Sequence, residues 1–325
     1  MKIAIDTLGC KLNQAETELL AGEYEKAGHQ IVADVKDADV YVLNTCTVTR
    51  TADSKARHLL RQARRRNAGA QIMATGCYVR RASEELKRIE GVKLLTGNGA
   101  AERAAEMMME CGAQVAETPS PGGREGGRTR AMIKIQEGCD AFCTYCIVPL
   151  VRGKSRSVPA DEVISQIREK AAESFKEVVL TGTEPGSYTH EGAGLKELLE
   201  KVLIETEVLR IRVSSLQPNE ITEELLALWE DERLCPHFHL SLQSGSDSVL
   251  KRMGRRYSVT DYLAAVNLIR EKAPDVAITT DIIVGFPGET DEDFEKTLEI
   301  CRRVNFAKIH VFPYRTLIVI NGLAS

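Results

Sequence analysis

The sequence lacks the features that mark membrane and secreted proteins. Its longest apolar runs fall well short of the about 20 residues that a membrane-spanning helix needs, and we expect no targeting segment. Nine cysteines in 325 residues are too sparse for a disulfide scaffold, so a reducing compartment is favoured. We therefore expect a cytoplasmic protein with no membrane partner.

A large net charge is also missing. The formal net charge of −4 at pH 7 neither requires nor excludes nucleic acid, because binding depends on where basic residues cluster. The 325 residues, of which 43% are hydrophobic, can bury a sizeable core in about two domains. This composition is compatible with a cytosolic enzyme.

A fourth cysteine is absent from the most informative motif of the chain. Cys139, Cys143 and Cys146 stand at C-x3-C-x2-C spacing in one short segment. Structural zinc sites usually have four protein ligands, whereas three thiolates leave one metal position open for a substrate or cofactor. A [4Fe-4S] cluster with an open iron fits this spacing best. The alternative is a zinc site that takes Cys111 or Cys235 as its fourth ligand.

The chain is predicted to divide into two α/β units. Residues 117–127 are rich in glycine and proline, which is typical of a linker between residues 1–116 and 128–314. In the first unit, short apolar strands alternate with helical patterns, which predicts a parallel sheet. Strands are expected at Lys2–Thr7, Val40–Asn44, Gln71–Thr75 and Leu94–Thr96, and helices at Gln14–Ala27, Ala52–Arg66, Ser83–Ile89 and Ala101–Cys111.

The second unit repeats the strand-helix pattern six times as far as its strands go. This rhythm predicts a partial (β/α)6 parallel barrel, with its chemistry at the C-terminal ends of the strands by analogy with complete α/β barrels. Strands are expected at Met132–Gln136, Glu177–Leu180, Arg210–Ser214, His237–Leu242, Ala277–Val284 and Lys308–Phe312. Helices are expected at Ala160–Ser174, Leu195–Glu205, Thr222–Glu230, Thr260–Lys272 and Asp291–Val304.

Three cysteines of the first unit occupy equivalent positions. Cys10, Cys46 and Cys77 each lie just beyond the end of an expected strand and just before a helix. Because parallel strands end on one edge of a sheet, these cysteines can converge in one crevice, where helix N-termini would favour thiolates. The alternative is that they are small buried hydrophobic residues. Three equivalent positions favour a second metal cluster.

The cysteine motif of the second unit, with Phe142 and Tyr145 before its second and third cysteines, resembles the cluster motif of the radical S-adenosylmethionine (SAM) enzymes. The resemblance implies that SAM binds the open iron and is cleaved to a 5′-deoxyadenosyl radical. Polar groups for the amino, carboxylate, ribose and adenine parts of SAM are then expected after later strands, although each alone could be a polar cap of a turn. The candidates are Thr183, Glu184, Ser214, Ser215, Gln243 and Gly285.

Longer segments resemble the methylthiotransferases within this class. The resemblance extends over almost the whole chain, through Thr7–Glu18, Asn44–Thr49, Gly76–Tyr78, Cys139–Arg156, Cys235–Gly245 and Thr280–Thr290. Its Leu-Gly-Cys-Lys-Leu-Asn-Gln-Ala-Glu-Thr segment is most similar to the subfamily that converts N6-threonylcarbamoyladenosine at tRNA position 37 to its 2-methylthio derivative. The other known substrates are isopentenylated adenosine of tRNA and a ribosomal protein aspartate.

The resemblance implies a sulfur-group transferase with two [4Fe-4S] clusters. SAM on the Cys139/Cys143/Cys146 cluster would yield the radical that removes hydrogen from adenine C2. A sulfur associated with the Cys10/Cys46/Cys77 cluster and methylated by another SAM would then add to that carbon. No acid-base triad is expected, since the cofactors carry the hard chemistry. The implied partners are tRNA and a reductant such as flavodoxin or ferredoxin.

Basic residues offer further candidates for tRNA contacts. One set recurs at helical spacing and the other follows the cysteine motif, where each could contact phosphates. The alternative is a solvated face with cations placed near a helix C-terminus. The candidates are Arg57, Arg61, Arg64, Arg65, Arg152, Lys154 and Arg156. His237 and His239 alternate on one strand, where structural hydrogen bonding is favoured over metal ligation.

The last residues depart from the family pattern. After Val311–Tyr314, relatives resemble Ser-x-Arg-x-Gly-Thr-x-Ala, then a helix and a small RNA-binding β-barrel called TRAM. Residues 315–325 form a different tail here, so we expect the last helix and the TRAM barrel to be absent, as in a truncated chain. From another class of function, the chain could then be an inactive remnant that binds clusters or RNA without turnover.

Overall fold

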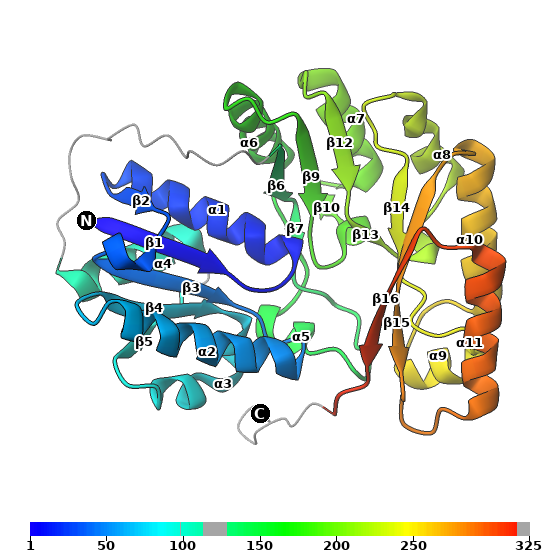
Figure 1. The fold of residues 1–325 in the computed structure, drawn as a ribbon. Helices are drawn as coiled ribbons and strands as arrows, with labels where there is room; N and C mark the ends of the chain where they lie inside the picture. Colours follow the sequence, from blue (N-terminus) through cyan, green and yellow to red (C-terminus); the bar gives the residue numbers. More distant parts are fainter. Residues whose placement is uncertain (98, 113–128, 317–325) are drawn as a thin grey trace. The chain divides into compact units, whose positions relative to one another are not determined.

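The computed structural model describes residues 1–97, 99–112 and 129–316. The chain forms two compact units that divide between Arg128 and Thr129 (Figure 1). The expected linker, residues 117–127, and nearly all of the expected tail lie outside the described residues. Within the described ranges, no helix is both long enough and apolar enough to cross a membrane.

The first unit is an open, parallel five-stranded sheet with the order β2-β1-β3-β4-β5. The strands are β1 (Lys2–Thr7), β2 (Gln30–Val32), β3 (Val40–Thr45), β4 (Gln71–Gly76) and β5 (Val92–Leu94). The helices are α1 (Lys11–Lys26), α2 (Arg50–Arg66), α3 (Cys77–Lys87) and α4 (Ala100–Cys111), with a short 3-10 turn, η1, at Val35–Asp37.

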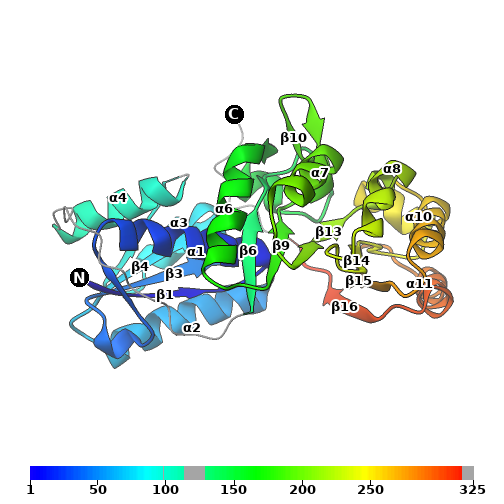
Figure 2. The ribbon, with the colours of Figure 1, turned by 90° about the horizontal axis from the view of Figure 1, so that it is seen from above.

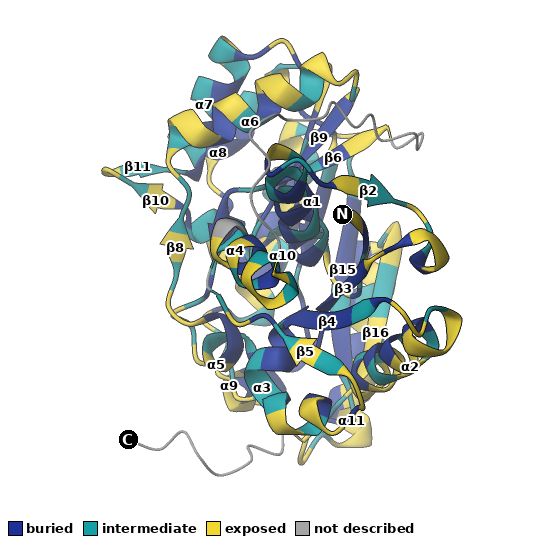
Figure 3. Ribbon diagram, turned by 90° about the vertical axis from the view of Figure 1, so that its left-hand side faces the viewer, coloured by how far each residue is buried: buried dark blue, intermediate teal, exposed yellow. Residues whose placement is uncertain are grey.

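Helices cover both faces of this sheet, so its central strands are buried. All six residues of β3 are buried, and Figure 3 shows β3 and β4 in the colour of buried residues. Leu60 of α2 and Leu86 of α3 join the apolar cluster on one face, whereas Leu20 of α1 and Met107 of α4 join the cluster on the other. Helices α1 and α2 accordingly lie on opposite sides of the sheet (Figures 1 and 2). Burial on both faces is what a parallel sheet requires.

Several elements of the first unit differ from the sequence prediction, among them α1, which begins at Lys11 rather than Gln14. Strand β2 was not predicted, and β5 lies two residues earlier than expected, because three-residue strands carry too little alternation. Helix α3 begins at Cys77 rather than Ser83. Its backbone leaves helical geometry at Ala82, with φ −146° and ψ 54°. The apolar pattern restarts there, so the part of the helix before Ala82 cannot be recognised from the sequence. Cys77 is therefore the first residue of a helix and not a loop residue before one.

The second unit contains the six expected strands of a partial parallel barrel. They are β6 (Arg130–Lys134), β9 (Glu177–Thr181), β12 (Arg210–Val213), β14 (His237–Leu240), β15 (Ala277–Val284) and β16 (Lys308–Pro313). The covering helices are α6 (Ala160–Ala172), α7 (Leu195–Glu205), α8 (Glu223–Leu226), α10 (Val259–Lys272) and α11 (Asp291–Val304), with the turn η4 (Ala227–Glu230) extending α8. The predicted fold class is confirmed.

The row of barrel strands breaks at Ser214. The order β12-β9-β6 forms one sheet, and β13 (Ser215–Leu216) starts a second sheet with the order β13-β14-β15-β16. A single bridge between Ile211 and Leu234 joins β12 to the segment before β14. Figure 2 shows the strands following one another in a curved row, with α7, α8 and α10 along one side. At the break, Ser214 is buried and its N–H donates to the Leu180 carbonyl at 3.0 Å.

Short elements between the main strands were not predicted from the sequence. They are β7 (Gln136–Glu137), α5 (Val148–Arg152), β8 (Arg156–Ser157), η2 (Pro185–Ser187), β10 (Thr189–His190), β11 (Ala193–Gly194), η3 (Pro218–Glu220) and α9 (Asp247–Met253). All are shorter than the about 11 residues over which apolar periodicity is read in a sequence. Within the described residues, no further β-barrel follows β16.

We predict that Gly76→Ala lowers the stability of the first unit by about 2–4 kcal/mol. Gly76 has φ +93°, and an added Cβ would collide with Asn44 Oδ1 and lie 2.5 Å from the Thr45 carbonyl oxygen. Gly22, inside α1, has open space at the same position, so Gly22→Ala is the control and should stabilise by about 0.5–1 kcal/mol. Urea unfolding followed by circular dichroism measures both. Equal midpoints for the two variants would contradict this prediction.

Candidate functional site

The loop that carries Cys139, Cys143 and Cys146 is closed at its base by β7 and β8. These strands pair antiparallel, with Gln136 opposite Ser157 and Glu137 opposite Arg156. The Arg156 guanidinium also lies 2.7 Å from the Glu137 carboxylate. Inside the loop, the amide of Cys139 donates to the Gly153 carbonyl at 3.1 Å. The loop therefore begins after the first barrel strand, and its end pairs with its beginning.

The fully buried side chain of Gln136 fixes this loop to the turn after β9. Its amide nitrogen donates to the Gly138 carbonyl at 2.8 Å and to Ser155 Oγ at 2.9 Å. Its carbonyl oxygen accepts the backbone N–H groups of Thr183 and Glu184, each at 3.0 Å. One side chain thus satisfies groups of the cysteine loop and of the predicted SAM-binding turn. The sequence prediction missed Gln136, because these partners are up to 48 residues away.

The three thiols lie near one another among charged neighbours. Cys139 Sγ is 3.1 Å from Glu184 Oε2, and burial together with this carboxylate raises the pKa of Cys139 to about 12. Burial also raises the pKa of Cys146, and the charge of Cys143 adds to that rise. Cys143 Sγ accepts a hydrogen bond from Arg255 Nη1 at 3.4 Å. Such thiols become thiolates when a bound cation supplies the opposite charge, so this donor set fits an iron cluster.

A network of polar side chains surrounds the thiols. Glu184 is buried and accepts from Arg256 at 2.6 Å and from the Gln217 amide. Arg255 donates to Gln217 Oε1 at 3.0 Å and to the Tyr257 hydroxyl at 3.0 Å. Arg255 thus contacts the cysteine loop directly, and Arg256 contacts it through Glu184.

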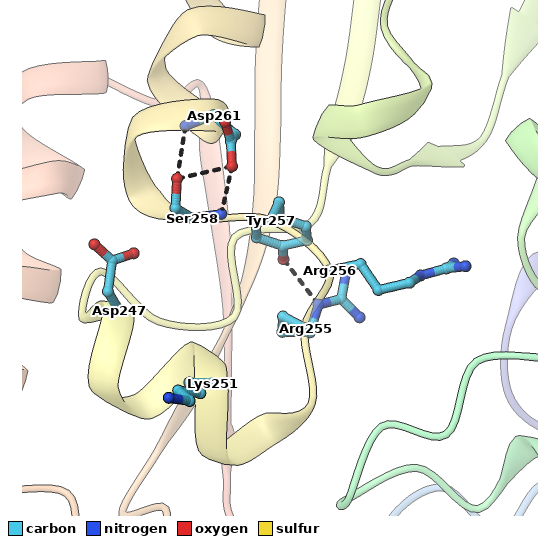
Figure 4. A pocket seen from close by; sticks show the side chains of 7 residues that line it. All are labelled: Asp247, Lys251, Arg255, Arg256, Tyr257, Ser258 and Asp261. Carbon is cyan, nitrogen blue, oxygen red and sulfur yellow. Dashed lines mark hydrogen bonds between the residues drawn. The ribbon is translucent and has the colours of Figure 1, made fainter.

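Arg255, Arg256 and Tyr257 also line a polar hollow of about 380 Å³ on the other side of this network (Figure 4). Figure 4 shows Arg255 directed toward the Tyr257 hydroxyl, with the capping pair Ser258 and Asp261 opposite. The remaining lining residues are Asp247 and Lys251. The hollow mixes basic and acidic groups, so it has no strong charge preference.

The predicted SAM contacts lie at the ends of successive strands. Thr183 and Glu184 follow β9, Ser214 stands at the barrel break, and Gln243 follows β14. Thr183 Oγ1 and Ser214 Oγ are buried and have no hydrogen-bond partner among the described residues. Buried polar groups are seldom left unpaired, so these two hydroxyls fit a site that a polar ligand completes.

Gln243 has an unusual backbone for a residue other than glycine. Its φ of +68° is held by hydrogen bonds from its N–H to the Asp281 carbonyl and from the Ile283 N–H to its own carbonyl, each 2.9 Å. Strain of this kind is concentrated at binding sites. Ser215 begins β13 and Gly285, with φ +72°, follows β15.

The two predicted aromatic residues of the loop differ in their surroundings. Phe142 is 82% exposed, whereas Tyr145 packs against the apolar cluster that contains Met253 and Phe286. The Tyr145 hydroxyl accepts a hydrogen bond from Arg255 Nη1 at 3.4 Å. Tyr145 therefore anchors the loop, and Phe142 has its ring available for a ligand.

The structure separates the cysteine loop from the cysteine proposed as a fourth zinc ligand in the same unit. Cys235 is buried just before β14 and donates its N–H to the Ile211 carbonyl at 2.8 Å. It lies at the N-terminal end of the barrel strands, whereas the loop follows the C-terminal end of β6. Cys235 is therefore on the wrong side of the barrel to complete a zinc site with this loop.

In the first unit, Cys10, Cys46 and Cys77 follow the ends of three adjacent strands. Thr7 is in register with Asn44, and Thr45 with Gly76, so β1, β3 and β4 end at the same edge. Cys46 and Cys77 come directly after β3 and β4, and Cys10, separated from β1 by two residues, is the N-cap of α1. Cys10 is exposed, and the other two are buried.

Close contacts hold the three cysteine-bearing segments together. A Cβ added to Gly9 would lie 2.9 Å from Cys46 Sγ, so the backbone before Cys10 rests on Cys46. Asn13 donates to the Leu8 carbonyl at 2.7 Å and to the Thr45 carbonyl at 3.1 Å. Thr7 Oγ1 and Thr75 Oγ1 on these strands are buried without a partner in the described ranges. Three thiols and unpaired hydroxyls at one sheet edge fit a metal cluster.

Side chains of α2 and α3 lock the residues next to two of these cysteines. Thr47, which follows Cys46, donates to Asp53 at 2.6 Å, and Arg81 bonds Thr47 at 2.6 Å and Asp53 at 3.0 Å. The hydroxyl of Tyr78, which follows Cys77, accepts from Arg57, and Arg57 also pairs with Glu85 at 2.7 Å. Arg57, which we expected to contact RNA, is thus part of this support.

The other basic candidates include residues that pair within the protein and residues that do not. Arg64 donates to the Ala68 carbonyl at 2.8 Å at the end of α2. Arg152 is buried near Glu137, which also pairs with Arg156. Arg61, Arg65 and Lys154 are exposed, and none has a hydrogen-bond or ion-pair partner among the described residues. Among the seven candidates, these three side chains are the ones that are exposed and have no partner in the described residues.

Comparisons with known proteins agree with this architecture. The model of the Radical SAM superfamily matches residues 133–301, and that of the Uncharacterized protein family UPF0004 matches residues 2–97. The solved structure of the radical S-adenosylmethionine methyltransferase TsrM from Kitasatospora setae, with cobalamin and a [4Fe-4S] cluster bound, is 16% identical and superposes with a TM-score of 0.71. The superposition covers 97% of this chain and 75% of TsrM and shows a shared fold. Fold and family model together make the chain a radical SAM enzyme.

Curated relatives narrow this class. Threonylcarbamoyladenosine tRNA methylthiotransferase MtaB of Aquifex aeolicus is 40% identical over 97% of this chain and 80% of its own length. MtaB of Thermotoga maritima is 39% identical over 96% of this chain and 74% of its own length. The tRNA-2-methylthio-N(6)-dimethylallyladenosine synthase of Endomicrobium trichonymphae is 33% identical over 97% of this chain and 76% of its own length. The chain therefore belongs to the radical SAM methylthiotransferases, which are transferases of a sulfur-containing group and use SAM and a [4Fe-4S] cluster.

We predict that Gln136→Leu weakens retention of the cluster by the Cys139 loop. The variant leaves the N–H groups of Thr183 and Glu184 without their acceptor, at a cost of about 1–3 kcal/mol each. Iron should fall to about half of the parent value or less after anaerobic reconstitution. The parent has Cys10, Cys46 and Cys77 replaced by alanine, so that the remaining iron reports on this loop.

The matched control is Gln166→Leu, which removes an amide that bonds Glu162 on the same helix. This variant should keep the iron of its parent. Unchanged iron in Gln136→Leu would mean that the loop does not depend on the buried amide.

Proposed function

We propose that this enzyme is a tRNA methylthiotransferase that converts N6-threonylcarbamoyladenosine at tRNA position 37 to its 2-methylthio derivative. The single observation that carries the proposal is the convergence of Cys10, Cys46 and Cys77 at one sheet edge, in addition to the radical SAM loop. Relatives at 39–40% identity are named for threonylcarbamoyladenosine, and those at 33–34% for dimethylallyladenosine. The higher identity to the first group favours threonylcarbamoyladenosine as the substrate.

Each unit would hold one [4Fe-4S] cluster. Cys139, Cys143 and Cys146 would ligate the first and leave an iron open for SAM, and the three cysteines of the first unit would ligate the second. When bound, these groups supply hydrogen abstraction from adenine C2 and the sulfur that is transferred. A reductant such as flavodoxin or ferredoxin would provide the electron.

The protein's own side chains would bind and orient these groups. Gln136 holds the cysteine loop against the turn that carries Glu184. The hydroxyls of Thr183 and Ser214, which are buried without a partner among the described residues, would receive polar parts of SAM. In the first unit, Thr47 and Tyr78 are fixed by α2 and α3, which keeps the neighbouring thiols in place. None of these roles requires a side chain to act as an acid or a base.

Separate cysteine sets allow the two proposed roles to be tested independently. A Cys10→Ala/Cys46→Ala/Cys77→Ala variant should release 5′-deoxyadenosine from SAM but form no methylthio product, because only the second cluster is lost. The matching Cys139/Cys143/Cys146 variant should lose both activities. Mass spectrometry of nucleosides from digested tRNA measures the product, and Cys301→Ala is the control. Methylthio product formed by the Cys10→Ala/Cys46→Ala/Cys77→Ala variant would contradict the two-cluster mechanism.

Mass spectrometry of tRNA nucleosides, together with that of digested ribosomal protein, separates the candidate substrates. Product on tRNA that carries threonylcarbamoyladenosine supports the proposal. Product on dimethylallyladenosine tRNA or on a ribosomal protein aspartate would reassign the substrate. Reduced, cluster-loaded enzyme that binds SAM but never releases 5′-deoxyadenosine would instead favour a remnant that binds without turnover.

We also propose that the exposed face of α2 contacts tRNA through Arg61 and Arg65. Replacing both by glutamine should weaken tRNA binding about tenfold and reduce the salt slope by about 1–2, since each lost phosphate contact releases about one counterion fewer. Fluorescence anisotropy at several salt concentrations measures both quantities. The control is Arg302→Gln/Arg303→Gln, which removes the same charge from exposed positions on α11. An equal loss in both double variants would indicate a general charge effect.

A further inference from the structure

Four polar side chains share one face of the β14-β15-β16 ladder. The register pairs His239 with Thr279 and Asp281 with His310. Side chains alternate along a strand, so all four lie on the same face. The opposite face carries core residues packed with α10 and α11, namely Phe238, Leu240, Ile278 and Ile282. The four polar groups therefore face the inside of the partial barrel.

The histidines and the aspartate converge on one point. His239 Nε2 lies 3.2 Å from Asp281 Oδ2, and His310 Nδ1 lies 3.2 Å from Asp281 Oδ1. One donor atom from each of the three side chains lies within 4.8 Å of the other two. Donor atoms around a tetrahedral zinc ion, bound at about 2.0–2.1 Å, are separated by about 3.3 Å. The two histidine–carboxylate separations, each to a different oxygen of Asp281, are close to this value.

The surroundings also suit a metal ion. His239 Nδ1 lies 3.0 Å from Thr279 Oγ1, which fixes the ring and directs Nε2 toward Asp281. Metal-bound histidines usually have the second ring nitrogen engaged in this way. His239 is 8% exposed, whereas the side chain of His310 is 42% exposed. An ion can thus enter beside His310 and keep one position for water.

We propose that His239, Asp281 and His310 form a binding site for one divalent cation of the Zn²⁺ type, separate from the cysteine clusters. Two imidazoles, one carboxylate and an open fourth position are the ligand set of zinc sites with a bound water. Each ligand comes from a different strand of one ladder, so the geometry is set by the sheet. The site requires neither the proposed tRNA substrate nor the second cluster.

The test uses holoenzyme with reconstituted iron-sulfur clusters, so that the cluster cysteines are occupied. Zinc is titrated in competition with a chromogenic chelator. Wild type should bind one zinc ion, and Asp281→Asn and His310→Gln should each lower the affinity about tenfold or more. His237→Gln is the matched control, because His237 lies on the same strand and face two residues before His239. It should bind like wild type.

X-ray absorption at the zinc edge identifies the ligands directly. Nitrogen and oxygen neighbours at about 2.0 Å, without sulfur at about 2.3 Å, are expected. A sulfur shell, or equal affinity in wild type and both site variants, would assign the zinc to cysteines and overturn the proposal. Absence of zinc binding in wild type would also overturn it and leave a hydrogen-bonded cluster only. Unfolding midpoints in the presence of EDTA verify that the variants remain folded.

Discussion

Parallel strands deliver their C-terminal ends to one edge of a sheet, and both units depend on this constraint. In the first unit it brings together cysteines that are 36 and 31 positions apart in the chain. In the second unit it sets the cysteine loop beside the turns that carry Glu184, Ser214 and Gln243. The helices serve the same end, because a parallel sheet is stable only when both of its faces are covered.

Both edges carry polar groups that the protein leaves unsatisfied. Thr7 and Thr75 in the first unit, and Thr183 and Ser214 in the second, have buried hydroxyls without partners among the described residues. Burying such a group costs about 1–3 kcal/mol, and burial also holds the pKa of Cys139 and Cys146 above the usual range. Each site is therefore less stable alone than with a ligand that supplies positive charge and hydrogen bonds.

Sequence patterns located the long elements and the cysteines but not the support around them. The bounds of α7, α11 and β15 were predicted residue for residue, because each spans at least two full periods of its pattern. Strand β2 and helix α9 are too short to show a period. Charge alone suggested that Arg57 and Arg152 face RNA, yet Arg57 is half-buried and paired with Glu85, and Arg152 is buried near Glu137. Gln136 and the His239–Asp281–His310 group depend on partners distant in sequence, which no local pattern reports.

The side chain of Gln136 has a thermodynamic consequence beyond holding the loop. It bonds the cysteine loop through its nitrogen and the Thr183–Glu184 turn through its oxygen, so ordering either segment pre-orders the other. With the cluster in the loop and SAM at the turn, as proposed, loading the loop would lower the entropy that SAM must overcome at the turn. By reciprocity, bound SAM would strengthen retention of the cluster by the same factor. A single buried amide would then make the two cofactors cooperative.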